Sequence, residues 1–294
     1  MSSQIFNMLE KLGLSSRQTR VLFNQRTRDK KNVKVWQDTI SAVIYIDDFY
    51  TGDATYIEGL YRGRQTAELN IGTPDFERNQ DAQRRLNAYL PFVAGKKMAD
   101  FGCGQGDFLK QIKPHCTDVL GIELQQNYLK HLNDNGVPCS NSLEAIADNS
   151  LDIVVSFHVI EHLPDPLTVL TAIKQKIHSG GHVIIEVPHA RDFLLTQLAC
   201  DDFKQFTLWS QHLLLHTRQS LQKMLAFVGF IDIQIEGVQR YSLSNHLHWL
   251  SHGKPGGHKS TLAMIESNAL LDAYQNALAR VDATDTLVAI AQVP

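Results

Sequence analysis

The sequence predicts an α/β fold with a doubly wound, mostly parallel sheet, and two observations lead to this prediction. Short β-prone runs and helix-period segments alternate from residue 97 to the C-terminus, which is the order that builds strand–helix–strand units. The run at 97–101 also ends in a turn with three glycines, Gly102, Gly104 and Gly106, ahead of a helix pattern. Such a turn brings backbone N–H groups against a nucleotide-like ligand.

Composition and charge narrow the class of protein. The 294 residues are 43% hydrophobic and 20% charged, which is typical of a globular enzyme with a full core. The net charge of −3 gives no reason to expect nucleic acid as a partner. The four cysteines lack disulfide or metal-ligand spacing, and neither a signal peptide nor a membrane span is indicated. We therefore expect a cytoplasmic protein with no membrane span, and a homodimer is left open.

Residues 1–92 are expected to form an extension ahead of the sheet. A short N-terminal helix leads into a basic run, which we expect to be a solvated arm or face. Two β-prone runs, 33–36 and 41–46, are joined by a polar turn and predict a hairpin. A helix is predicted from 73 to 90, with Thr as N-cap and Pro at its first position, and it is expected to end before Pro91.

Residues 93–294 are expected to hold the sheet and its helices. Strands are predicted at 97–102, 117–124, 136–140, 151–157, 182–187, 230–236 and 286–292. Helices are predicted at 106–113, 125–134, 166–178, 220–226 and 261–279.

An acidic residue ends the second of these strands, about 20 residues past the glycines. A carboxylate in that place accepts hydrogen bonds from both ribose hydroxyls of an adenosine. Because NAD and S-adenosylmethionine share this requirement, Glu123 by itself leaves the cofactor open.

The glycine spacing in Asp100-Phe-Gly-Cys-Gly-Gln-Gly departs from G-x-G-x-x-G and resembles the first motif of class I S-adenosylmethionine-dependent methyltransferases. Residues 152–166, which contain His158-Val-Ile-Glu161-His162-Leu-Pro, resemble the fourth strand and following turn of that family. The resemblance implies a seven-stranded Rossmann-like sheet, a methyltransferase activity and S-adenosylmethionine as cofactor. It further implies cofactor contacts from Asp100, Gly102, Cys103, Gly104, Gly106, Glu123, Leu124, Ser142, Phe157 and His158.

Other segments resemble methyltransferases associated with bacterial surface-polysaccharide synthesis, namely 49–52, 239–241 and 245–247. This resemblance implies a small polar acceptor, a sugar or sugar nucleotide. In several sugar methyltransferases a zinc ribbon occupies the place of the predicted hairpin. Here Gln37, Asp38 and Ser41 stand where thiolates are expected, so no metal is expected there.

In the seven-stranded methyltransferase sheet the last strand is antiparallel, so it starts at the edge where its predecessor ends. That edge is the carboxyl end of the parallel strands, where ligands bind. The segment 238–284 joins these two strands, and we expect it to be a substrate cap that contributes Asn245 and His246. A purely structural insertion is the alternative.

An oxygen or carbon acceptor requires a base to remove its proton. Trp209-Ser-Gln211-His212 resembles the Tyr-x-Glu-His segment of sugar C-methyltransferases, in which the histidine is that base. His212 matches the histidine, and Trp209 is expected beside the acceptor. Because a neutral glutamine does not stabilise an imidazolium as a carboxylate does, oxygen methylation is favoured. His158 and His162 are the other candidate bases.

Three alternatives stay open: methylation of carbon or nitrogen, a nicotinamide-dependent oxidoreductase, and a non-catalytic binding module.

The spacing His158-x-x-Glu161-His162 also matches the H-x-x-E-H zinc signature. That signature requires a helix, whereas Pro164 and Pro166 follow at once. We therefore expect a strand-to-helix turn there and no metal.

Overall fold

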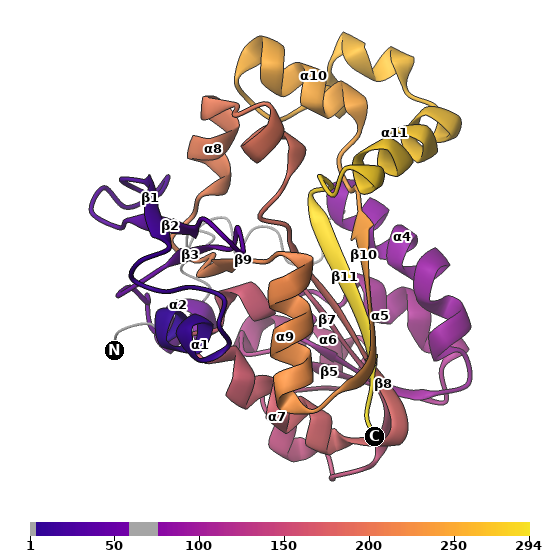
Figure 1. Ribbon diagram of the computed structural model, residues 1–294. Helices are drawn as coiled ribbons and strands as arrows, with labels where there is room; N and C mark the ends of the chain where they lie inside the picture. Colours follow the sequence, from indigo (N-terminus) through magenta and orange to yellow (C-terminus); the bar gives the residue numbers. More distant parts are fainter. Residues whose placement is uncertain (1–3, 59–75) are drawn as a thin grey trace.

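The computed structural model describes residues 4–58 and 76–294, and its centre is a seven-stranded sheet of order β10-β11-β8-β7-β4-β5-β6 (Figure 1). The strands are β4 (Lys97–Phe101), β5 (Asp118–Ile122), β6 (Cys139–Ser140), β7 (Leu151–Phe157), β8 (Ile177–Pro188), β10 (Ile231–Val238) and β11 (Thr286–Gln292). Only β11 runs antiparallel to its neighbours β10 and β8. The predicted sheet is therefore confirmed, with β6 shorter and β8 longer than expected.

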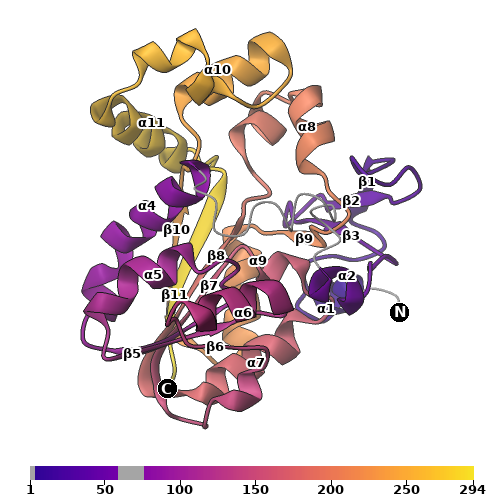
Figure 2. The ribbon, with the colours of Figure 1, turned by 180° about the vertical axis from the view of Figure 1, so that it is seen from behind.

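Both faces of the sheet are covered by helices. One face packs against α4 (Phe76–Val93), α5 (Asp107–Ile112) and α6 (Gln126–Asp134), which Figure 2 shows in front. The other face packs against α7 (Pro166–Lys176) and α9 (Arg218–Val228). Successive residues of β7 alternate between the two cores, with Ile153 and Val155 in one and Val154 in the other. A strand buried on both faces explains why its sequence is an unbroken apolar run.

The predicted end of the helix before Pro91 is wrong. α4 continues through Pro91 to Val93, and the predicted start at 73–75 lies outside the described residues. A proline this close to a helix C-terminus removes only its own N–H from the ladder. Tyr89 and Val93 are buried in the core on either side of it, and their packing keeps the last turn helical.

The N-terminal extension forms a second sheet of order β1-β2-β3-β9. Its strands are β1 (Arg20–Asn24), β2 (Val35–Asp38), β3 (Ile44–Ile46) and β9 (Leu214–Leu215), flanked by α1 (Ile5–Lys11) and α2 (Asp53–Ile57). The predicted hairpin is β2–β3. The basic run, expected as a solvated arm, in part forms β1, where Arg20 pairs with Asp47 at 2.7 Å and lies over the Trp36 ring.

β9 comes from the far half of the chain, so the extension shares a sheet with residues predicted for the main domain. The division at residues 92 and 93 stays a prediction. In the hairpin turn, Asp38 accepts N–H bonds from Ile40 and Ser41, and the Ser41 hydroxyl donates to the Leu14 carbonyl. Hydrogen bonds hold this turn where a zinc ribbon would use metal.

The insertion between β10 and β11 lies beyond the carboxyl ends of the parallel strands, as expected (Figure 1). It contains α10 (Leu243–His252) and α11 (Asn268–Arg280), with short η6 (Gly257–Lys259) and η7 (Thr261–Ile265) between them. The single helix predicted over 261–279 is wrong. Ser267 breaks it, because its hydroxyl accepts the Leu270 N–H and caps a new helix.

Short helical segments complete the connections. These are η2 (Lys113–His115), η3 (Leu143–Ala145), η4 (Ile160–His162), η5 (Phe193–Gln197) and α8 (Asp201–Thr207). Among the described residues, no helix is long and apolar enough to cross a membrane.

Candidate active site

A cavity of about 1390 Å³ opens at the carboxyl edge of the sheet, between the strand ends, the insertion and the N-terminal extension. Pockets for one small ligand are usually about 300–1,000 Å³. The cavity is therefore large enough for a cofactor and an acceptor together.

The glycine turn after β4 meets this cavity at Gly104. A Cβ atom built there would contact nothing within 4 Å, and the Gly104 N–H donates to Glu123 Oε2 at 2.8 Å. Added Cβ atoms at Gly102 and Gly106 would instead meet Val159 at 2.3 Å and Leu132 at 2.5 Å. Packing requires glycine at those two positions, whereas at Gly104 the space beside the backbone is open.

The predicted cofactor residues divide into two groups. The cavity is lined by Gly102, Gly104, Glu123, Leu124, Ser142, Phe157 and His158. Asp100, Cys103 and Gly106 are not part of its lining. Asp100 is buried beneath it, and burial raises the pKa of Asp100 to about 7. Cys103 turns its thiol toward Gly121.

Two arginines of α4 converge on Glu186 of β8, whose side chain is fully buried. Arg84 donates to both Glu186 oxygens at 3.0 and 2.9 Å, and Arg85 donates to Oε2 at 2.9 Å. These cations hold the pKa of Glu186 well below its usual range despite its burial. Only Arg85 also lines the cavity, where its guanidinium lies 4.4 Å from the centre of the Phe157 ring.

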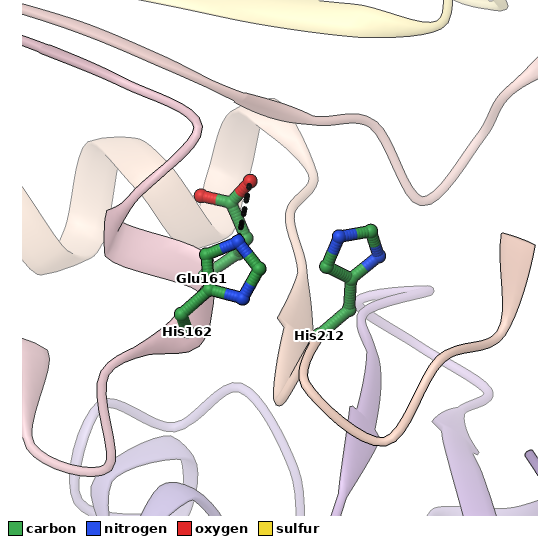
Figure 3. A group of neighbouring side chains, drawn as sticks. All are labelled: Glu161, His162 and His212. Carbon is green, nitrogen blue, oxygen red and sulfur yellow. Dashed lines mark ion pairs between the residues drawn. The ribbon is translucent and has the colours of Figure 1, made fainter. Parts of the chain in front are cut away.

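Three polar side chains meet on one wall of the cavity: Glu161, His162 and His212 (Figure 3). One ligand-type atom from each lies within 4.8 Å of the other two. Glu161 and His162 belong to η4, and His212 lies two residues before the start of β9. We call these three residues the η4–β9 cluster.

The polar atoms of this cluster are in unusual surroundings. Glu161 is 0% exposed, and within the described residues neither of its carboxylate oxygens has a hydrogen-bond partner. The same holds for His212 Nδ1. Burial raises the pKa of Glu161 to about 8 and lowers the pKa of His212 to about 3.

His162 is held by the main chain beside His212. Its Nδ1 lies 2.8 Å from the Gln211 carbonyl oxygen, so Nδ1 carries the proton and donates it. The other ring nitrogen, Nε2, lies 4.0 Å from Glu161 Oε1. His158 Nδ1 approaches the same oxygen at 3.3 Å without hydrogen-bond geometry.

Trp209, Asn245 and His246, the predicted acceptor contacts, all line the cavity. The Trp209 ring centre lies 5.5 Å from that of His212. The two residues of α10 are also engaged within the insertion: Asn245 Oδ1 accepts the Gly256 and Gly257 N–H groups, and His246 Nδ1 lies 2.7 Å from the Tyr274 hydroxyl.

Sequence reasoning missed several lining residues. Arg240 of the insertion pairs with Asp81 of α4, and Arg28 of the extension lies 4.6 Å from the centre of the Trp209 ring. The buried position of Arg240 follows from the tertiary contact with Asp81, which has no local sequence signal. Arg28 belongs to the basic run, and nothing in the sequence distinguishes it from the other arginines and lysines there.

The sequence profile of the methyltransferase domain family matches residues 76–235, more than half of the chain. The chain belongs to that family.

Two solved methyltransferases have the same fold. A SAM-dependent methyltransferase from Archaeoglobus fulgidus aligns with a TM-score of 0.52 and 19% identity, over 73% of this chain and 94% of its own. Phosphoethanolamine N-methyltransferase 2 from Haemonchus contortus, in complex with S-adenosyl-L-methionine, gives 0.50 and 19%, over 85% and 63%.

Curated relatives are similar to this methyltransferase over a shorter stretch. A ubiquinone biosynthesis O-methyltransferase from Ralstonia nicotianae is 30% identical over 121 residues, or 37% of this chain and 51% of its own. The protein of the same name from Methylococcus capsulatus is 33% identical over 101 residues, or 31% and 43%. The chain thus spans about half the length of the curated relatives it matches.

S-adenosylmethionine is the cofactor of this methyltransferase family, and the residues at the carboxyl edge fit it. The open backbone at Gly104 stands beside the Glu123 carboxylate, and Leu124 and Phe157 supply apolar walls. When bound, the cofactor supplies an activated methyl group on a sulfonium.

Proposed function

We propose that this methyltransferase transfers the methyl group to a hydroxyl oxygen of a small acceptor that carries a ring. The observation that carries the proposal is the η4–β9 cluster. A hydroxyl must lose its proton during methylation, and the cluster offers two histidine side chains and a carboxyl group on the wall of the cofactor cavity.

The walls of the cavity support an acceptor with a ring. Aromatic side chains from three parts of the chain line it, namely Tyr50, Tyr56, Phe203, Phe206, Trp209 and Trp249. Such walls stack equally well on a sugar ring or on a phenol. The sugar or sugar nucleotide expected from sequence is one candidate, and the O-methyltransferases of ubiquinone biosynthesis make a phenol the other. A cytoplasmic location and a homodimer are kept as predictions.

Within this proposal His212 is the first candidate for the group that receives the proton, with His162 next. Formation of S-adenosylhomocysteine would be measured against a panel of sugar nucleotides and catechols. For the best acceptor, His212→Ala should lower turnover by roughly 100-fold or more, because a positioned base contributes about 10²- to 10⁴-fold. Affinity for S-adenosylmethionine should stay within a few-fold of wild type.

A matched control is His178→Ala, which removes a histidine outside the cavity that hydrogen-bonds Asp152. Turnover of that variant should equal wild type. Methylation of amines alone, with no hydroxyl acceptor used, would overturn the proposal. Near-wild-type turnover by His212→Ala would move the base to His162 or His158.

A further inference from the structure

The η4–β9 cluster has a second property that its role as a base does not require. Three side chains meet there, and one atom of each lies within 4.8 Å of the other two: a carboxyl oxygen of Glu161 and one ring nitrogen each of His162 and His212. None of these three atoms donates a hydrogen bond to another. The Glu161 oxygens and His212 Nδ1 are buried and have no hydrogen-bond partner among the described residues, and buried polar atoms in that state are unfavourable unless a ligand such as a cation binds them.

We propose that Glu161, His162 and His212 bind one divalent transition-metal ion, with zinc as the best fit. Two imidazoles and one carboxylate form a common zinc ligand set. Catalytic zinc sites have three protein ligands and one open position, and here all three residues line the cavity. The open position would therefore face the acceptor.

The geometry needs only small side-chain movements. The three ligand atoms lie within 4.8 Å of one another. Around a tetrahedral zinc with bonds of about 2.1 Å they would be roughly 3–3.5 Å apart. Rotation of the side chains about χ1 and χ2 supplies the difference without a change of backbone.

The surroundings hold the ligands in the state that a metal requires. The Gln211 carbonyl accepts a hydrogen bond from His162 Nδ1–H, and a hydrogen bond of this kind is the usual outer contact of a metal-bound histidine. The Glu161 carboxylate has no hydrogen-bond partner among the described residues that a metal would need to displace.

This ligand set differs from the H-x-x-E-H spacing considered in the sequence. That spacing would use His158, Glu161 and His162, and we expected no metal because the signature needs a helix. The fold instead brings His212 close to Glu161 and His162. His212 is held there because β9, which follows it, pairs with β3 of the second sheet. A metal at these three residues would contradict the sequence-based expectation of a metal-free protein, and that expectation has not been tested.

The test measures metal binding directly and needs no acceptor. Full-length protein would be stripped with a chelator and titrated with Zn²⁺ and Co²⁺ by calorimetry, with metal content measured after dialysis. We expect about one zinc per chain. His212→Ala and Glu161→Gln should each weaken binding by at least roughly 100-fold, since a lost ligand costs more than the 10- to 100-fold of a lost outer contact.

His158→Ala is the matched variant, because it removes the histidine that the sequence spacing would use and should keep zinc within a few-fold. Retention of zinc by His212→Ala, or its loss from His158→Ala instead, would overturn the ligand set. Equal weak binding by wild type and all variants would mean an adventitious ion only. Melting curves and circular dichroism establish that each variant is folded. The visible spectrum of the wild-type Co²⁺ form reports imidazole ligation independently.

The inference deepens the proposed function, yet the two fail separately. A protein that binds zinc in the cluster but methylates only amines disproves oxygen methylation and keeps the metal. A protein that methylates hydroxyls without zinc keeps the function and leaves His212 as the base.

Discussion

Glu123 uses both oxygens of its carboxylate to hold the glycine turn. Oε2 accepts the Gly104 N–H and Oε1 accepts the Gln125 N–H, each at 2.8 Å. A carboxylate in this place orders the glycine turn beside the cavity, and we predict that it also accepts hydrogen bonds from the ribose hydroxyls of the cofactor. Its loss would therefore affect binding in two ways.

We expect Glu123→Ala to weaken S-adenosylmethionine binding by about 1.5–3 kcal/mol, the range for hydrogen bonds to a charged group. Calorimetry with the purified protein measures this. Glu144→Ala, which removes another acid of the cavity lining, should bind the cofactor like wild type. Unchanged affinity in Glu123→Ala would contradict the assignment of this residue.

Residue-level prediction placed Gly104 and Glu123 on the cavity wall, where the signal is local, and their contact with the cofactor stays a prediction. Gly104 and Glu123 are found because the turn and the acid stand at characteristic distances along the chain. The contact of His162 with His212 is made across 49 intervening residues and depends on the hydrogen bond from His162 to Gln211. No spacing in the sequence encodes that contact. For the same reason, Gly102 is glycine because of Val159, a tertiary neighbour.

Among the elements, α10 shows what periodicity alone does not predict. Its position over the cavity follows from the antiparallel β11 and was expected, whereas the helix itself was not. Polar residues such as Ser244 and Asn245 are buried on it, which conceals its apolar face. Asn245 Oδ1 then joins α10 to η6 through the N–H groups of Gly256 and Gly257, at 3.2 and 3.3 Å.

Asn245→Ala should loosen this joint, because two main-chain donors lose their acceptor at about 1–3 kcal/mol for a buried group. We expect the acceptor's KM to rise roughly 10-fold with kcat within a few-fold, since positioning contacts mainly affect binding. Hydrogen exchange of residues 253–260 should accelerate. Asn268→Ala on the exposed surface of α11 serves as the control. If the two variants had the same hydrogen exchange and the same KM, the hydrogen bonds of Asn245 to Gly256 and Gly257 would not be what holds α10 against η6.

At the scale of the whole molecule, buried ion pairs connect three layers. Glu186 of the sheet binds Arg84 and Arg85 of α4, while Asp81 of α4 binds Arg240 of the insertion. The insertion, α4 and the sheet are thus linked through charges that must stay ionised. The arginines oppose the effect of burial and lower the pKa of Asp81 to about 2.

These pairs determine how the fold responds to acid. A carboxyl whose pKa is lowered in the folded state contributes stability above its unfolded pKa, and loses it as the pH falls through the folded value. For Asp81 that window runs from 3.8 down to about 2, and Glu186 adds to it in the same direction. Asp100 and Asp192 act oppositely, because burial raises both pKa values to about 7. The stability that protonated Asp100 and Asp192 contribute to the folded state is lost as the pH rises from about 4 through 7.

The free energy of unfolding should therefore fall steeply between about pH 4 and 2, where Asp100 and Asp192 are largely neutral in both states. For Asp81 alone the loss is about 2–3 kcal/mol. In Asp81→Asn this slope should be flatter, and at pH 7 the variant should be about 3–5 kcal/mol less stable because Arg240 stays buried without its partner.

The control is Asp148→Asn, which removes an exposed carboxylate that pairs with Lys176. Its free energy of unfolding should stay within about 0.5 kcal/mol of wild type at every pH. Urea titrations at pH 7, 4 and 3 measure all three proteins. If Asp81→Asn kept the wild-type slope, the insertion and α4 would be joined by packing rather than by this ion pair.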